Sequence, residues 1–287
     1  MKILITVLAC FFCLISTTST ACTTWASVGS VNQLGGLLLV KNRDAPHKGH
    51  EKLILFHPKN HIPYLALAYN SNGSNQYPYY SAGVNQKGLA VVNNAADVYP
   101  VQYDREQGET SSMKAILKNY TSVAEVLQHA KQLFSTSKVN FLIIGDPKQI
   151  VTVEIGPKKQ YCIYGKTNNG FVYHTNQYQC KNLETFNHKK FPDSITRYHT
   201  IQKLLTTHTG KYTFNDYYTF SNRQNYGLNS SIFRKWTAAT WVLQYPSKGN
   251  PLLYVRFTSP AQQYHVYRIQ LTPAFWKHRT FSVVPSE

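Results

Sequence analysis

Cys22 is the residue whose position in this sequence most suggests chemistry. It follows a leader made of one basic residue, Lys2, an uncharged and mostly apolar run over residues 3–16, and a short polar stretch that ends at Ala21. This order, with small residues at the last and third-last positions, is typical of a cleaved secretory signal peptide. We therefore expect residues 1–21 to be removed, Cys22 to begin the mature chain, and the protein to reach the periplasm or the extracellular space.

A cysteine at the amino terminus carries a nucleophile and a base in one residue. Its α-amine has an unperturbed pKa of about 8, so a useful fraction is neutral at neutral pH and can accept the thiol proton. The thiolate is the attacking species, as in enzymes whose nucleophile is their first residue. Such a site also needs a group that orients the amine, a cation near the sulfur, and donors for the tetrahedral oxyanion.

Other side chains of the sequence could supply these groups. Asp44 could hold the amine, three basic residues could supply positive charge, and three asparagines at predicted strand ends could donate to the oxyanion. Each of them also has an interpretation as a surface or turn residue, so residue types alone support an enzyme only weakly. The basic candidates are Lys41, Arg43 and Arg197, and the donor candidates are Asn93, Asn94 and Asn176.

The elements that would position these residues are mostly strands, with a helical segment between two groups of them. The helix over residues 121–134 has the clearest apolar face, and Ser122 and Glu125 have the spacing of a capping box at its start. Two groups of strands around a helical middle indicate one α+β domain over residues 22–287, with sheets covered by helices. Strands are predicted over 22–28, 37–41, 52–56, 64–69, 89–94, 139–144, 150–155, 161–164, 170–175, 241–245, 252–257 and 264–271, weaker helices over 111–119 and from 193 or 194 to 205, and residues 207–235 are ambiguous.

The mature chain would keep an odd number of cysteines. In an oxidising compartment, the economical arrangement pairs Cys162 with Cys180 and leaves Cys22 as a free thiol. A structural cysteine has no reason to stand at a cleavage point, whereas a nucleophile does.

Composition limits the class of protein and its partners. The chain has 287 residues with 43% hydrophobic and 15% charged side chains, which excludes disorder of the whole chain. The net charge of +17 suits an acidic substrate, an anionic envelope or nucleic acid. The basic residues are scattered and no nucleic-acid module is recognisable, so we expect no nucleic-acid partner. No segment after the leader is apolar and long enough to span a membrane, and a homo-oligomer stays open. An uncleaved anchor and a lipoprotein signal are the alternatives for the leader.

The order of several sequence blocks resembles the linear-amide hydrolases of the N-terminal-nucleophile superfamily. The resemblance is to the choloylglycine hydrolase and penicillin V acylase group, and still more to the isopenicillin-N acyltransferase and carcinine hydrolase-like group. It covers most of the mature chain and implies a four-layer αββα sandwich. The blocks are CTT at 22–24, the Gly-Gly turn at 35–36, LLLVKNRD at 37–44, NQKGLAVVNN at 85–94, HTNQY at 174–178 and DSITRY at 193–198.

The resemblance implies a role for each matching residue. Cys22 matches the nucleophile, and Asp44 matches the aspartate that holds the free amine. Lys41 stands where the bile-salt and penicillin V branch has an arginine beside the sulfur. Lysine keeps the charge but lacks the planar fork of arginine, which disfavours bile-salt hydrolysis. The remaining matches are Asn93 or Asn94 for an oxyanion-hole asparagine, Asn176 for a second catalytic asparagine and Arg197 for an arginine that lines the site.

Competing interpretations of other residues have less support. The spacing of His47, His50, His57 and His61 fits no zinc pattern, so we expect them in a solvated basic loop. An acyl-thioester mechanism needs no metal or organic cofactor, and we expect neither. The carboxylates of Asp146 and Glu154 are expected to be structural.

The sequence therefore predicts an exported cysteine hydrolase or acyltransferase that acts on a linear amide C–N bond of a small molecule. The reaction would proceed through an acyl-thioester on Cys22, and the charge makes an anionic substrate compatible. The alternatives are a secreted basic binding protein that holds an acidic envelope ligand, and a catalytically inactive relative. The acyl group, the amine and the choice between hydrolysis and acyl transfer stay open.

Overall fold

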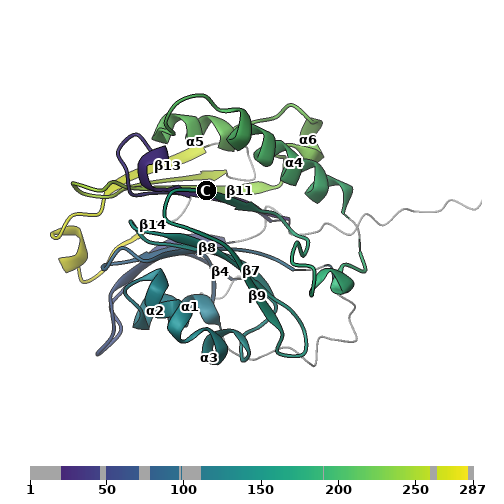
Figure 1. Ribbon diagram of the computed structural model, residues 1–287. Helices are drawn as coiled ribbons and strands as arrows, with labels where there is room; N and C mark the ends of the chain where they lie inside the picture. Colours follow the sequence, from purple (N-terminus) through teal and green to yellow (C-terminus); the bar gives the residue numbers. More distant parts are fainter. Residues whose placement is uncertain are drawn as a thin grey trace, which may run out of the picture.

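Two antiparallel sheets lie face to face, and each carries helices on its outer side (Figure 1). The computed structural model describes residues 21–45, 50–70, 78–96, 98, 111–189, 191–258 and 264–283. The order of layers is helix, sheet, sheet, helix. The α+β class and the αββα sandwich expected from the sequence are therefore confirmed.

The first sheet brings the segment that follows Cys22 beside the LLLVKNRD block. Thr23 of β1 lies opposite Asn42 of β2, and Asp44 at the end of β2 lies opposite Thr237 of β11. The start of β1, the end of β2 and the start of β11 therefore meet at one end of this sheet. Within the described residues its order is β10 (Gly170–His174), β1 (Thr23–Val28), β2 (Leu37–Asp44), β11 (Thr237–Tyr245), β12 (Leu252–Thr258) and β13 (Tyr264–Gln270).

The second sheet carries the paired asparagines. Asn93 and Asn94 are the last residues of β6, opposite Leu142 and Phe141 of β7. Its order in the described chain is β14 (Ser282–Val283), β3 (His50–Phe56), β4 (Tyr64–Asn70), β5 (Tyr79–Asn85), β6 (Ala90–Asn94), β7 (Asn140–Gly145), β8 (Ile150–Ile155) and β9 (Tyr161–Thr167).

The helices form the two outer layers (Figure 1). The predicted helix over 121–134 is divided at His129, whose ψ of 14° leaves the helical range, while the Ser122 side chain accepts from Glu125 N as its spacing predicted. The ambiguous residues 207–235 contain a helix with a complete capping box between Thr213 and Asp216. The second sheet carries α1 (Ser112–Asn119), α2 (Val123–Gln128) and α3 (Ala130–Phe134), the first carries α4 (Pro192–Thr207), α5 (Phe214–Ser221) and α6 (Gly227–Ser230), and short 3-10 helices span Gly29–Val31, Glu184–Phe186 and Phe275–Lys277.

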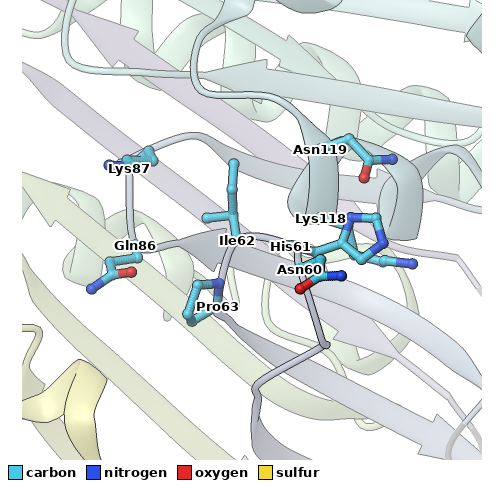
Figure 2. Close-up of a pocket in the computed structure, with 8 residues that line it drawn as sticks. All are labelled: Asn60, His61, Ile62, Pro63, Gln86, Lys87, Lys118 and Asn119. Carbon is cyan, nitrogen blue, oxygen red and sulfur yellow. The ribbon is translucent and has the colours of Figure 1, made fainter.

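A pocket of about 410 Å³ opens at the turn between β5 and β6 (Figure 2). Gln86 and Lys87 of this turn line it on one side, and His61 and Lys118 line it on the other. This turn is at the opposite end of β6 from Asn94, so the pocket is separate from the residues that the sequence singles out for chemistry.

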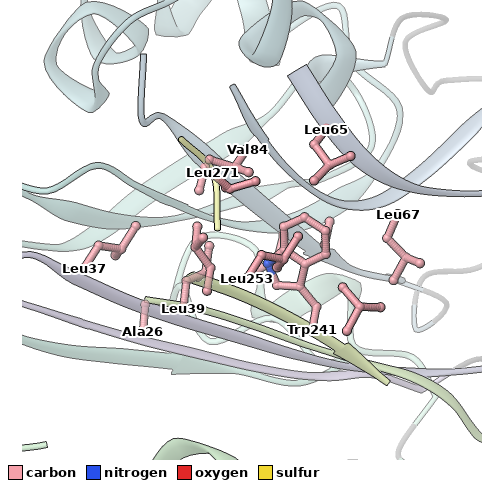
Figure 3. Close-up of a cluster of buried hydrophobic side chains, with 14 of the residues drawn as sticks. Ala26, Leu37, Leu39, Leu65, Leu67, Val84, Trp241, Leu253 and Leu271 are labelled. Atoms are coloured by element: carbon pink, nitrogen blue, oxygen red, sulfur yellow. The ribbon is translucent and has the colours of Figure 1, made fainter. Parts of the chain in front are cut away.

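The alternation of β2 between the two faces of its sheet fixes the direction of its polar end. Leu37 and Leu39 pack in the core between the sheets, with Trp241, Leu65 and Leu67 (Figure 3). Leu38 and Val40 pack on the other face, against α4 and α5. Because successive side chains of a strand point to opposite faces, Lys41 and Arg43 continue the face between the sheets, and Asn42 and Asp44 continue the face beneath the helices.

The cysteines are arranged as the economical pairing suggested. Cys162 of β9 forms a disulfide with Cys180, which follows β10. Cys22 is free and buried. No helix in the described part of the chain has both the length and the apolar character needed to cross a membrane.

Truncating a leucine between the sheets should cost far more stability than truncating an exposed one. Leu39 is fully buried between the sheets, whereas Leu228 on α6 is 68% exposed. We expect Leu39→Ala to lower the free energy of unfolding by about 2–5 kcal/mol and Leu228→Ala to change it by less than about 0.5 kcal/mol. Urea unfolding with the disulfide intact measures both, and equal midpoints for the two variants would contradict this core.

Candidate active site

Cys22 lies immediately before β1, with 3% of its surface exposed. By the alternation of β1 it shares the face of Ala26 and Val28, which belong to the core between the sheets. Lys41 of β2 lies on the same face and hydrogen-bonds with the Cys22 side chain. Burial lowers the pKa of the Lys41 ammonium, and the charge of the Cys22 thiolate partly offsets this. The nucleophile candidate is therefore in contact with a buried cation.

The two neighbouring asparagines of β6 have different surroundings. Asn93 holds Lys41, whose Nζ donates to the Asn93 backbone oxygen and, at 3.0 Å, to its Oδ1. Asn94 Nδ2 donates to Thr24 Oγ1 at 2.8 Å, and its buried Oδ1 has no hydrogen-bond partner in the described residues. Asn93 thus anchors the cation, whereas the Asn94 amide reaches the strand that begins at Cys22.

Arg197 of α4 connects the backbone of Cys22 to Asn176. Its side chain is fully buried, and its Nη1 donates to the Cys22 carbonyl oxygen at 2.6 Å and to Thr23 Oγ1 at 2.8 Å. Its Nη2 donates to Asn176 Oδ1 at 3.2 Å. Burial lowers the pKa of Arg197, and the Asp44 charge opposes this. This arginine fixes the backbone at Cys22 rather than pointing at the sulfur.

Asn176 follows β10, and three contacts hold it in place. Its backbone nitrogen donates to Ser194 Oγ at 3.0 Å, its Oδ1 accepts from Arg197, and its Nδ2 donates to the Ala95 carbonyl oxygen at 2.9 Å. An amide nitrogen has two hydrogens, so one N–H of Asn176 remains for another acceptor.

Asp44 is fully buried and keeps one carboxylate oxygen without a hydrogen-bond donor in the described residues. Thr237 Oγ1 donates to Oδ1 at 2.7 Å. Oδ2 lies 3.5 Å from Arg234 Nε but receives no hydrogen bond. Burial raises the pKa of Asp44 to about 6, against the opposing charges of Arg234 and Arg197. A buried oxygen of this kind can accept one further hydrogen bond.

Arg234 is part of this cluster, and the sequence analysis did not identify it. Its Nη1 donates to Asp193 Oδ2 at 2.6 Å while its Nε faces Asp44. Asp193 Oδ2 also lies 3.4 Å from Arg197 Nη2. Arg234 lies in residues 207–235, for which the sequence gave no clear secondary structure. The feature that could have identified it is its place just before β11, the strand that pairs with the end of β2.

Arg43, one of the cation candidates, lies on the face between the sheets. Its Nε is 2.9 Å from Glu51 Oε1, and its guanidinium carbon is 3.8 Å from the centre of the Tyr69 ring. Lys41, Arg43 and Arg197 therefore all lie near Cys22 but have distinct partners.

The carboxylates expected to be structural have structural partners. Glu154 is fully buried and accepts from His174 Nε2 at 2.9 Å, from Tyr164 Oη at 2.8 Å and from two backbone nitrogens. Asp146 accepts from Val123 N at 2.7 Å at the start of α2.

Of the four histidines that invited a metal interpretation, the structure describes the side chains of His57 and His61. His57 contacts the His278 carbonyl oxygen, while His47 and the His50 side chain lie outside the described residues. Across the described ranges, no cluster of three or more metal-ligating side chains occurs.

Two comparisons with known proteins bear on this site. The family model described as acyl-coenzyme A:6-aminopenicillanic acid acyl-transferase matches residues 31–250, a span that includes Lys41, Asp44, Asn176 and Arg197 and begins after Cys22. The crystal structure of a variant of the conjugated bile acid hydrolase from Clostridium perfringens superposes with a TM-score of 0.55, over 92% of this chain and 97% of that chain, at 12% identity. At that identity the likeness shows the fold alone. Among curated proteins, none matches this chain.

The stability of a chain in which Ala21 still precedes Cys22 should depend on the protonation of Asp44. A folded pKa of about 6 against an ordinary value of about 3.9 means that the folded state binds more protons between about pH 4 and pH 6. The free energy of unfolding therefore decreases as pH rises through this window and then levels off.

Asp44→Asn removes this pH-dependent contribution. The free energy of unfolding of the variant, relative to that of the parent, should therefore rise by roughly 2–3 kcal/mol between pH 4 and pH 7. Urea unfolding of both chains at several pH values in this range measures the difference. A difference that is the same at pH 4 and pH 7 would show that the Asp44 carboxylate is not strained by its burial.

Proposed function

Because the chain belongs to the acyl-coenzyme A:6-aminopenicillanic acid acyl-transferase family, we propose that it is a cysteine hydrolase or acyltransferase of linear amide C–N bonds. We further propose that the active form is exported and begins at Cys22. The observation that carries the proposal is the contact between the buried Cys22 side chain and Lys41, next to a β2 end where Asp44 keeps an unused acceptor oxygen.

The first step of the proposed reaction is activation of the thiol. In the mature chain the α-amine of Cys22 takes the thiol proton, and Asp44 Oδ2 accepts a hydrogen bond from that amine. Support for this pairing comes from the strand register, because Thr23 lies opposite Asn42 and Asp44 is two residues further along β2. The Lys41 ammonium compensates the negative charge that forms on sulfur.

The second step is attack on the substrate. The thiolate adds to the amide carbonyl carbon, and the negative charge moves to the carbonyl oxygen, where donors held in advance stabilise it. The amide of Asn94 beside Thr24 and the remaining N–H of Asn176 are the donors we propose. The α-ammonium then returns its proton to the nitrogen of the leaving amine as the C–N bond breaks.

The third step regenerates the enzyme. Water or a second amine attacks the acyl-thioester on Cys22, gives its proton to the α-amine, and releases an acid or a new amide. Arg197 contributes by holding the Cys22 carbonyl oxygen and Asn176 in one arrangement. This positioning matters because catalysis depends steeply on the alignment of base and nucleophile.

The alternative of a basic binding protein has less support. A binding role does not require a free buried cysteine in contact with a lysine. Nor does it require an aspartate that is kept buried at a cost in stability.

The N-terminus of the exported protein tests the proposal directly. We expect intact-mass measurement and N-terminal sequencing to give one chain that begins at Cys22. One molar equivalent of a thiol reagent should then abolish activity, because Cys22 is the free thiol of the mature chain. Cys22→Ser should still be exported, but should take up no reagent and lose activity, since a hydroxyl ionises far less readily than a thiol. A mature chain that starts elsewhere, or an active Cys22→Ser protein, would refute this function.

Asn176→Ala tests the oxyanion role. Turnover should fall by roughly 10²–10³, the usual loss for one such donor. The matched control is Asn187→Ala, because Asn187 also hydrogen-bonds with the backbone of this segment, at Tyr178, but does not contact Arg197. Asn187→Ala should lower the melting temperature without lowering the turnover of the folded protein. If both variants lose activity only in proportion to the unfolded fraction, Asn176 is structural.

A further inference from the structure

A buried carboxylate holds both ends of the loop that carries Asn176. Glu154 of β8 is fully buried. Its side chain accepts from the ring of His174 at 2.9 Å, where the loop begins. It also accepts from the backbone nitrogens of Gln179 at 2.8 Å and Cys180 at 3.1 Å, where the loop ends. One side chain therefore closes the loop, with Asn176 between the two points of attachment.

The disulfide secures the far end of the same loop. Cys162 lies opposite Glu154 in the pairing of β8 with β9, and it is joined to Cys180. Cys180 is thus bound through its sulfur to β9 and through its backbone nitrogen to Glu154. The near end of the loop, at His174, is fixed by noncovalent contacts instead.

His174 joins the two sheets at the start of the loop. It is the last residue of β10, lies opposite Thr24 of β1, and reaches Glu154 in the second sheet. Its other ring nitrogen is 2.7 Å from the carbonyl oxygen of the peptide bond between Thr175 and Asn176. A histidine ring donates from both nitrogens only when it carries both protons, so Glu154 and His174 form an ion pair.

The pair lies in surroundings that keep water away. Glu154 is 0% and His174 1% exposed, and the centre of the Phe141 ring is 4.5 Å from that of the His174 ring. Burial raises the pKa of the Glu154 carboxyl, but the hydrogen bond and charge of His174 and the backbone N–H groups of the loop outweigh burial and lower the pKa overall. Apolar residues of similar volume are often as stable as a buried ion pair, so stability alone does not account for this one.

We propose that Glu154 and His174 are positioning residues that hold the Asn176 amide where the oxyanion forms. The inference rests on the proposed function. The pair acts without touching the substrate: it fixes the peptide bond between Thr175 and Asn176, while Arg197 holds the Asn176 side chain. A donor stabilises the transition state when it is already aimed at the developing charge, so a shift of the loop by about 1 Å removes much of this effect.

Glu154→Gln tests the pair in the mature protein. Glutamine keeps the size of the side chain but removes the charge and turns an N–H group towards the donors of the loop. The probes are 4-nitroanilides that carry an acetyl, octanoyl or phenylacetyl group, and release of 4-nitroaniline gives kcat and KM. We expect kcat to fall by roughly 10- to 100-fold and KM to stay within about threefold, because the lost interaction serves the transition state.

Asp146→Asn is the matched control. Asp146 is also a buried carboxylate that accepts from backbone nitrogens, those of Val123, Lys148 and Gln149, but it lies at the other end of the hairpin formed by β7 and β8. This variant should lower the melting temperature and leave the kcat of the folded protein unchanged.

A double substitution separates positioning from a general loosening of the fold. In an Asn176→Ala protein, Glu154→Gln should lower kcat by less than about twofold, because the donor that the pair positions is already gone. Alkylation of the Cys22 thiol by iodoacetamide forms no oxyanion. Its rate in Glu154→Gln should therefore stay within about twofold of the wild-type rate.

Tyr164→Phe decides the question if melting shows that Glu154→Gln does not fold. It removes the hydroxyl that donates to Glu154 Oε1 at 2.8 Å and leaves the ion pair with His174 in place. We expect kcat to fall by roughly two- to fivefold in the parent, the loss of one modest hydrogen bond, and to stay unchanged in the Asn176→Ala protein.

The outcomes separate this inference from the function on which it rests. The inference is overturned, and the enzyme remains, if the folded Glu154 and Tyr164 variants keep the parental kcat or lower it equally with and without Asn176. Equal slowing of alkylation and of anilide cleavage would overturn it too. If the wild type cleaves none of the anilides and Cys22 is never acylated, the proposed function is overturned and the inference falls with it.

Discussion

The pairing of β1 with β2 is the interaction on which the rest of the site depends. It joins the strand that begins next to Cys22 to the strand that ends in four polar residues, 41–44. Pleating then divides these four residues between two environments. Lys41 and Arg43 enter the space between the sheets with the thiol, while Asn42 and Asp44 face the helical layer. One short strand therefore places positive charge near the Cys22 sulfur on one face and a buried carboxylate on the other.

The helical layer supplies the groups that keep this strand end in place. Asn42 Nδ2 donates to the backbone oxygens of Ser221 and Ile232. Arg197 of α4 donates to the carbonyl oxygen of Cys22. Each buried charge in this layer has an opposite charge or an oriented dipole close by, as buried ions require. Asp44 Oδ2 lies 3.5 Å from Arg234 Nε but accepts no hydrogen bond from the described residues.

Much of this arrangement could be predicted from the sequence, because it is local. The apolar run at the start of LLLVKNRD predicted the strand, and the resemblance singled out Lys41 and Asp44 at its end. β2 continues three residues beyond its predicted end because polar residues with buried partners can still pair. The residues that the sequence did not predict depend on contacts between segments that are far apart in sequence. Arg234 meets Asp44 only through the pairing of β11 with β2, and no periodicity in residues 207–235 signals that contact. The surroundings of Asn93 and Asn94 can be told apart only from the sheet. Asn93 accepts from Lys41, whereas Asn94, the next residue of β6, donates to Thr24.

The disulfide and the free cysteine of this chain need opposite redox states of their sulfur atoms. Conditions that oxidise Cys162 and Cys180 also act on Cys22, and thiol–disulfide exchange proceeds only where a thiolate and a disulfide sulfur can meet. The disulfide ties β9 to the segment after β10, while Cys22 is 97% covered between the sheets. Burial is thus a kinetic barrier to exchange between the Cys22 thiol and this disulfide. The same cover keeps a bulky oxidised thiol or a partner protein from reaching the Cys22 sulfur.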